Sequence, residues 1–214
     1  MPNWCYTEIT IYHNDKEKLK AFYKKIDEWR KKPFKKNDFD TYTLGWLGNI
    51  VGNSGLAEWK MRENGTEDFV PNIRCRGSLQ NFEYHKENIY ITTETAWGPM
   101  LEMWKLLCDK YLPDADIYYT AEESGNGLYK TNNPDVIGKY YIDTWDTPPE
   151  EFKDVTSEYE ASLEYTTHLL QRILDTKESD IDKLIDMLNR SDNQEWISIH
   201  AWETVELDEV ISCE

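Results

Sequence analysis

Apolar and polar residues alternate along the first part of the chain with a period that changes from that of a strand to that of a helix. Residues 5–12 alternate with period two and are rich in β-branched and aromatic side chains, which predicts a half-buried strand. The residues that follow, as far as Pro33, place Leu19, Phe22 and Ile26 at helical spacing. The chain therefore opens with a strand and an amphipathic helix.

The same two periods return further along the chain. The pattern predicts a hairpin of strands over 73–84 and 88–95, a helix over 100–112, a strand pair over 116–121 and 127–130, and a strand over 139–143. The resulting order of β, α, β, β, α, β with a terminal hairpin is that of a split βαβ unit. We therefore predict an α+β fold with a ferredoxin-like antiparallel sheet.

Two further segments complete the predicted organisation. Residues 34–62 are too apolar for a solvated loop and too rich in glycine for a long strand, so we expect an ordered insertion with a short helix. After Thr147-Pro148-Pro149 the pattern predicts helices over 157–176 and 179–190, then a strand over 196–205 that we expect to join the sheet. The predicted parts are a ferredoxin-like domain at 1–146 and an acidic helical extension packed on it at 147–214.

Charge is unevenly distributed between these parts. The chain has 24 Lys and Arg against 41 Asp and Glu, a formal net charge of −17. Residues 1–60 carry 11 basic and 8 acidic side chains, 61–146 carry 8 and 15, and 147–214 carry 5 and 18. A charge of this sign repels phosphate, so direct binding of nucleic acid is not expected.

Other classes of function lack a signal in the sequence. The four cysteines lie far apart, the four histidines have no metal-ligand spacing, and no nucleophile motif is matched, so we predict no catalytic residue, metal or cofactor. No apolar run is long enough for a membrane span, and the first residues have no signal-peptide pattern. We therefore expect a cytoplasmic protein that does not contact the membrane.

The acidic extension suggests a surface for binding another protein. If its helices form as predicted, acidic side chains repeat at intervals of four residues and line one face of each helix, namely Glu160 and Glu164 on the first and Glu178, Asp182 and Asp186 on the second. The ordinary interpretation is a solvated helix face. The functional interpretation is a surface that meets a basic, nucleic-acid-binding groove on a partner protein.

A second candidate site is a cluster of cations and rings. Arg74 and Arg76 lie two apart on a predicted strand, so their guanidinium groups share a face. In the predicted fold they lie near three aromatic residues, Trp4, Trp97 and Tyr129. Such a cluster can bind an anionic nucleotide by phosphate pairing and base stacking. Salt bridges from the arginines to Glu83 or Glu94 are the structural alternative.

A third candidate is a carboxylate site at the predicted turn after the strand 116–121. Glu122 and Glu123 are adjacent there, beside Gly125, and could converge with Asp116 or Glu94 for acid–base catalysis or metal binding. Solvated turn charges are the alternative interpretation.

Three sequence segments carry a resemblance to a known family. They are Met1-Pro2-Asn3-Trp4-Cys5 at the start, Thr95-Ala96-Trp97-Gly98-Pro99 before the second helix, and Tyr118-Tyr119-Thr120-Ala121-Glu122-Glu123-Ser124-Gly125. In this order, over residues 1–146, the chain resembles the YubB ferredoxin-like family, which is encoded largely by bacteriophages, plasmids and integrated elements and has no assigned function. The chain departs from that family at residues 74–81, which replace a tryptophan-rich stretch, and in the extension after residue 147.

These observations support three hypotheses. The first, which we favour, is a non-enzymatic phage or mobile-element protein that blocks a host protein with a basic surface, as a counter-defence inhibitor of the anti-CRISPR or anti-restriction type. The mobile-element origin is implied by the resemblance, and the blocking role by the charge. The alternatives are a small-molecule binder that sequesters a nucleotide signal through the arginine cluster, and an enzyme that uses Glu122 and Glu123.

Overall fold

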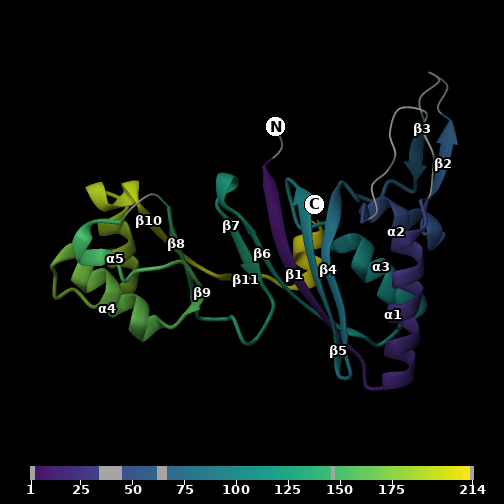
Figure 1. Cartoon of the computed structure of the whole chain (residues 1–214), viewed down its shortest axis with the longest axis horizontal. Coiled ribbons are helices and arrows are strands. Elements are labelled where there is room, and N and C mark those ends of the chain that lie inside the picture. Colours follow the sequence, from purple (N-terminus) through teal and green to yellow (C-terminus); the bar gives the residue numbers. More distant parts are fainter. Residues whose placement is uncertain (1–2, 34–44, 62–66, 146–147, 213–214) are drawn as a thin grey trace. The chain divides into compact units, whose positions relative to one another are not determined.

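The computed structural model describes residues 3–33, 45–61, 67–145 and 148–212. The chain folds as two compact units (Figure 1). The first comprises Met1–Asn132 together with Val205–Glu214, and the second comprises Asn133–Thr204. The second unit is therefore inserted in the sequence between the main body of the first unit and its last helix.

The first unit is built on an antiparallel sheet. Five of its strands follow the order β7-β6-β1-β5-β4, namely β1 (Trp4–Tyr12), β4 (Gly77–His85), β5 (Asn88–Ala96), β6 (Asp116–Glu123) and β7 (Leu128–Thr131). The central strand β1 pairs with β5 along its whole length, from Trp4 opposite Ala96 to Tyr12 opposite Asn88. The fold class is α+β, as predicted. The order β6-β1-β5-β4 is the order expected of the split βαβ arrangement.

Helices cover one face of this sheet (Figure 1). The helices are α1 (Lys16–Lys31), α2 (Leu47–Asn53), α3 (Leu101–Tyr111) and α6 (Leu207–Ser212). The Asp15 carboxylate starts α1 by accepting hydrogen bonds from the backbone N–H groups of Glu17 and Lys18. Apolar side chains of all four helices pack against Ile9 and Ile91 of the sheet in one core. This packing fixes which face of each strand is buried.

The predicted insertion at 34–62 contains α2 and the start of a small hairpin. This hairpin consists of β2 (Glu58–Met61) and β3 (Glu67–Val70), which pair antiparallel. Residues 34–44 and 62 of the predicted insertion lie outside the described residues. A short 3₁₀ helix, η1 (Ser124–Asn126), connects β6 to β7.

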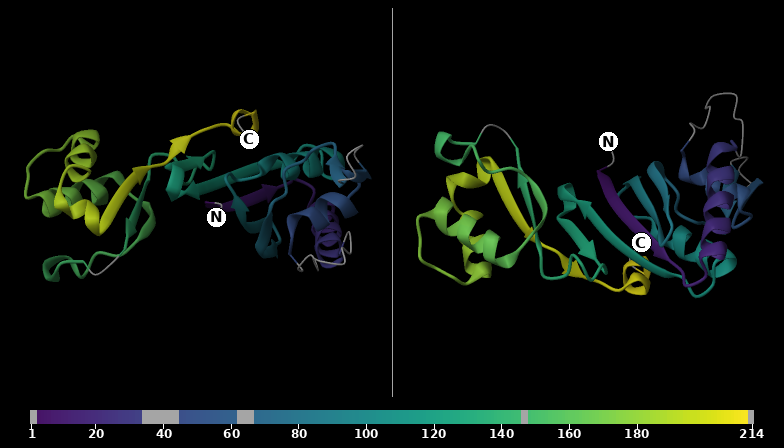
Figure 2. Two further views of the ribbon diagram at one scale, coloured as in Figure 1. Left: turned by 90° about the horizontal axis from the view of Figure 1, so that it is seen from above. Right: turned by 60° about the horizontal axis from the view of Figure 1, so that its bottom comes forward.

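The second unit has a separate sheet and core. Its three strands follow the order β10-β8-β9, with β8 (Tyr140–Thr144), β9 (Glu158–Ala161) and β10 (Ile197–Ala201). Two helices, α4 (Leu163–Leu174) and α5 (Ile181–Leu188), bury Leu170, Ile173 and Leu184 against Ile142 and Ile199 of the strands. Figure 2 shows these elements from two further directions. The remaining elements are η2 (Glu150–Phe152), η3 (Asp192–Glu195) and β11 (Glu203–Thr204), the last of which is the sixth strand of the main sheet.

The division into units differs from the predicted one at residue 146. The strand predicted over 139–143 belongs to the second unit, because β8 pairs with β9 and β10 and buries Ile142 in the second core. Of the strand predicted over 196–205 and expected in the main sheet, residues 197–201 form β10, which pairs with β8, with Ile199 opposite Ile142, whereas residues 203–204 form β11, which does stand in the main sheet. The chain returns to the first unit at Val205, whose backbone N–H donates to the carbonyl of Thr131 at 3.0 Å.

The helix predicted over 157–176 is also divided. Residues 158–161 form the strand β9, and α4 starts only after Ser162, whose hydroxyl accepts a hydrogen bond from the backbone N–H of Tyr165.

No helix within the described ranges is both long enough and apolar enough to cross a membrane.

Candidate functional site

The second face of the main sheet carries polar and aromatic side chains. Cys5, Ile9 and Ile11 of β1 are buried in the helical core, so the alternating residues between them point the other way. Residues paired across antiparallel strands share a face. We call this surface the open face, made of the strand positions of β1 and β4–β7 that point away from the helical core.

The open face has an unusual composition. Its strand positions include five carboxylates, Glu8, Glu83, Glu94, Asp116 and Glu122, and six aromatic residues, Trp4, Tyr6, Tyr12, Tyr90, Tyr118 and Tyr129. None of these strand positions carries Lys or Arg. Trp4 is 50% exposed and Tyr12 is 37% exposed, whereas Tyr129 is buried. The face is therefore acidic and aromatic.

Glu8 lies at the centre of the open face. It is opposite Thr92 of β5 and Thr120 of β6. The phenol groups of Tyr6 and Tyr90 hydrogen-bond the Glu8 carboxylate. Burial raises the pKa of both phenols, and the nearby Glu8 carboxylate raises them further, so the two hydroxyls stay protonated and act as donors.

One helix on the other face of the sheet is basic. Helix α1, which packs on the other face of the sheet, carries seven basic and three acidic side chains. The first unit thus separates a basic helix from an acidic sheet face.

The structure brings part of the predicted arginine cluster together. The backbone N–H of Ala96 donates to the carbonyl of Arg76 at 2.9 Å, and that of Trp97 donates to the carbonyl of Asn3 at 3.0 Å. Because Trp4 is opposite Ala96, the backbones of Arg76, Trp4 and Trp97 meet at one end of the sheet.

Other predictions about this cluster differ from the structure. Arg74 and Arg76 are both exposed, but they precede β4 instead of lying on a strand. Tyr129 is buried at 6% exposure on β7, two strands away from β1.

Glu122 and Glu123 do not form a pair. Strand β6 extends to Glu123, so the two side chains point to opposite faces of the sheet. Glu122 belongs to the open face, whereas Glu123 is buried at 1% exposure, and its Oε2 has no hydrogen-bond partner among the described residues. The prediction that they act as a pair on a turn is wrong, because it ended the strand two residues too early.

The predicted acidic stripes are also absent as helical features. Glu160 lies on β9 and Glu164 on α4, so they share no helix. Glu178 precedes α5, and its carboxylate accepts hydrogen bonds from the backbone N–H groups of Ser179 and Asp180. Only two of the predicted residues, Asp182 and Asp186, lie four apart on α5.

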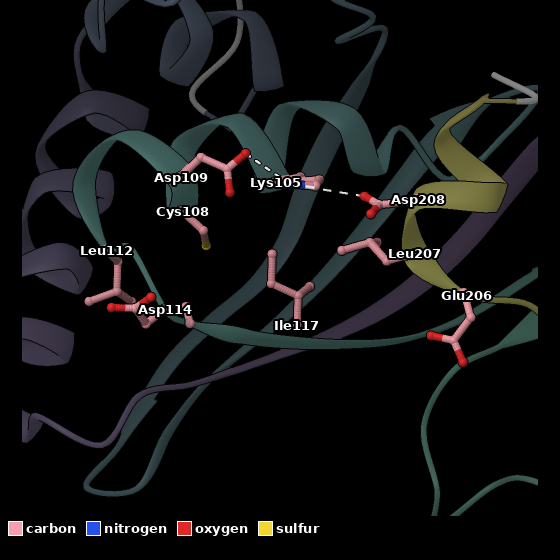
Figure 3. Close-up of a pocket in the computed structure, with 10 residues that line it drawn as sticks. Lys105, Cys108, Asp109, Leu112, Asp114, Ile117, Glu206, Leu207 and Asp208 are labelled. Atoms are coloured by element: carbon pink, nitrogen blue, oxygen red, sulfur yellow. Dashed lines mark hydrogen bonds and ion pairs between the residues drawn. The ribbon is translucent and has the colours of Figure 1, made fainter.

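A cavity of about 230 Å³ lies between α3, α6 and the start of β6 (Figure 3). Four carboxylates line it, namely those of Asp109, Asp114, Glu206 and Asp208, together with the amine of Lys105. Lys105 Nζ lies 2.9 Å from Asp109 and 4.0 Å from Asp208. This lining repels anions, so the cavity does not suit a nucleotide phosphate.

The cavity also contains a cysteine. Cys108 is buried, and burial raises the pKa of its thiol to about 12. The thiol is therefore protonated near neutral pH and is a poor nucleophile.

Within the described ranges, no group of three or more His, Cys, Asp or Glu side chains is arranged to hold a metal ion.

Comparison of the chain with protein-family profiles, with curated proteins and with solved structures finds no match. The resemblance to the YubB family stays a prediction.

The sequence did contain a signal for the open face, because the alternation predicted over 5–12 already places Tyr6, Glu8 and Tyr12 on one side of a strand. The neighbours of Glu8 come from distant strands, which that pattern does not identify.

Proposed function

We propose that this protein is a non-enzymatic binding protein that docks the open face of its main sheet on a basic, nucleic-acid-binding surface of a host protein and blocks it. The observation that supports this function is the composition of the open face, with five carboxylates, six aromatic residues and no Lys or Arg at its strand positions.

The chemistry of such a face suits a partner rich in Arg and Lys. Carboxylates take the places that phosphates occupy in a basic groove, and aromatic rings attract cations through their faces. Tyr and Trp are also the residues that most often supply binding energy at protein interfaces. Nucleic acid itself is repelled by the same carboxylates.

Other functions have less support. An anionic nucleotide is disfavoured by the acidic open face and by the acidic lining of the cavity. A carboxylate enzyme is disfavoured because Glu122 and Glu123 point to opposite faces. The counter-defence role, of the anti-CRISPR or anti-restriction type, follows from the resemblance to a family of mobile elements and is the part of the proposal that depends on it.

Two charge-matched variants provide the test. The open-face variant replaces Glu8, Glu94 and Glu122 with Gln. The second-unit variant replaces Glu164, Asp182 and Asp186 with Gln. Each changes the formal net charge from −17 to −14, so a difference between them reports the position of the charges and not their number.

Immobilised wild-type protein and both variants are incubated with a bacterial extract, and each captured protein is then purified. We expect the wild type and the second-unit variant to capture the same nucleic-acid-binding protein and to displace DNA or RNA from it, and the open-face variant to fail. Displacement by the open-face variant but not by the second-unit variant would contradict the proposal. So would a captured protein that keeps its nucleic acid.

A further inference from the structure

We infer that Glu8, held between Tyr6 and Tyr90, is the anchor for one arginine side chain of the partner. This inference rests on the proposed function and identifies the part of the open face that selects the partner.

The register of the sheet defines the surroundings of Glu8 in three rows. In its own row, Thr92 and Thr120 are its neighbours, and both are small. Paired side chains on one face have Cβ atoms about 4.5–5.5 Å apart, and diagonal neighbours about 7–8 Å apart. Thr92 and Thr120 are buried, whereas Glu8 is partly exposed, so a long side chain from a partner meets Glu8 itself between the larger residues of the adjacent rows.

The adjacent rows supply rings on one side and charge on the other. One row contains Tyr90, Thr10 and Tyr118, and the next contains Glu94, Tyr6 and Glu122. Tyrosine rings thus stand near the centre of the face, within reach of a cation bound at Glu8. The diagonal carboxylates add negative potential at the same point.

The Glu8 carboxylate is oriented and still has acceptor capacity. A carboxylate offers about four lone-pair positions, and the Tyr6 and Tyr90 hydroxyls take two of them. Other carboxylates of the face have local partners. Glu83 accepts a hydrogen bond from Asn81 and lies 3.3 Å from the His85 ring, and Glu94 accepts a hydrogen bond from Gln80 at 3.0 Å.

These features favour arginine over lysine. A guanidinium group is planar, can donate two parallel hydrogen bonds to one carboxylate, and stacks on aromatic rings. An ammonium group is a compact and strongly hydrated charge that does neither as well. The site therefore distinguishes two cations of equal charge.

The test uses an arginine-rich and a lysine-rich peptide of equal length and charge, each labelled with a fluorophore. Binding to the full chain is measured by fluorescence anisotropy at low salt. We expect the wild type to bind the arginine peptide roughly tenfold more tightly than the lysine peptide. Glu8→Gln should remove this preference and weaken arginine binding roughly tenfold.

Two further variants separate the anchor from general electrostatics. Glu164→Gln removes the same charge from α4 of the second unit, outside the open face, and we expect it to retain the preference for arginine, with affinity within about twofold of the wild type. Tyr90→Phe keeps the ring but removes the hydroxyl that holds Glu8. We expect it to lower arginine binding roughly threefold, with little change for lysine. Thermal unfolding of each variant confirms that it is folded.

The outcomes distinguish this inference from the proposed function. Equal binding of both peptides, with Glu8→Gln no weaker than Glu164→Gln, would overturn the arginine anchor and leave the docking face in place. No binding of either peptide at low salt would contradict the open face as a cation-binding surface, and with it the proposed function.

Discussion

The carboxylates of the second unit and those of the open face differ in their partners. The second unit carries 17 acidic and 6 basic side chains, a formal net charge of −11, whereas the first carries 24 and 18, a net charge of −6. Yet some acidic groups of the second unit have a cationic partner within the unit, as in Glu160 with Lys139 at 2.6 Å and Asp186 with Arg190 at 2.6 Å. The strand positions of the open face have no Lys or Arg to provide such pairs.

This comparison shows that net charge alone does not identify a docking surface. An acidic side chain that already has a cationic neighbour gains less from a basic partner, because the partner has to compete with that neighbour. Carboxylates grouped with aromatic rings, on strand positions that carry no Lys or Arg, keep more of their field for an incoming surface. The less acidic unit is therefore the better candidate for binding a basic protein.

The largest expected effect is on binding of the basic partner. Replacing Glu8, Glu94 and Glu122 together with Gln should weaken binding roughly 100-fold, because three charge-assisted contacts are lost. The second-unit variant should change affinity less than about threefold. Titration calorimetry with the purified partner measures both. Equal losses for the two variants would mean that total charge, and not the open face, determines affinity.

Salt should produce the next largest effect. Raising the ionic strength from about 0.01 M to 0.15 M shortens the screening length from about 30 Å to 8 Å. We expect the association rate with the basic partner to fall roughly tenfold over this range, and the rate for the open-face variant to change much less. Stopped-flow fluorescence gives both rates. A salt response that is the same for both proteins would place the steering charges elsewhere.

In the second unit, the paired carboxylates should matter for stability instead. The Arg172 guanidinium donates two hydrogen bonds to Asp154, at 2.8 and 2.9 Å, and these lower the pKa of that carboxyl below its usual value of 3.8. A lowered pKa contributes stability above the unfolded value, and this stability is lost as pH falls through the folded value. Asp154→Asn should therefore lower the Tm modestly at pH 7.

The same variant provides its own pH control. Below the folded pKa of Asp154 the wild-type carboxyl is protonated too, so the Tm difference between the two proteins should shrink toward zero in acid. Thermal unfolding followed by circular dichroism at a series of pH values measures this difference. A difference that stays constant down to strongly acidic pH would show that the ion pair is not its source.

The smallest expected effect is on the stability of the open face. Glu94 lies diagonally from Glu8 in the sheet, and the repulsion between like charges makes folding less favourable. Glu94→Gln should therefore leave the Tm unchanged or raise it by about 1–2 °C, even though it weakens binding. Calorimetry of the free protein checks this. A clear loss of stability would indicate that Glu94 has a structural role.

Local patterns predicted the elements of the first unit well. The alternation over 5–12 and the helical spacing of Leu19, Phe22 and Ile26 are local signals, and they correspond to β1 and α1. The pattern includes residues 158–161 in the predicted helix because so short a segment before a long apolar pattern gives no clear period. Ser162, a good N-cap residue, marked the true start of that helix.

The candidate site depended on contacts that a local pattern does not contain. Which strand pairs with β8 is decided by burial in the second core, and a local pattern does not show that residues 197–201 pair there. Likewise, the alternation in β1 identifies Glu8 as facing away from the core, but only the register with β5 and β6 brings Thr92, Thr120 and Tyr90 around it.

The most direct test of the docking surface is to map where a basic ligand binds. Nuclear magnetic resonance spectra of the isotope-labelled full chain are recorded during a titration with the arginine-rich peptide. We expect the largest shifts in β1, β5 and β6, centred on Glu8 and its neighbours, with small changes in α4 and α5. Shifts that are largest on α4 and α5, or that are spread evenly over both units, would contradict the open face as the docking surface.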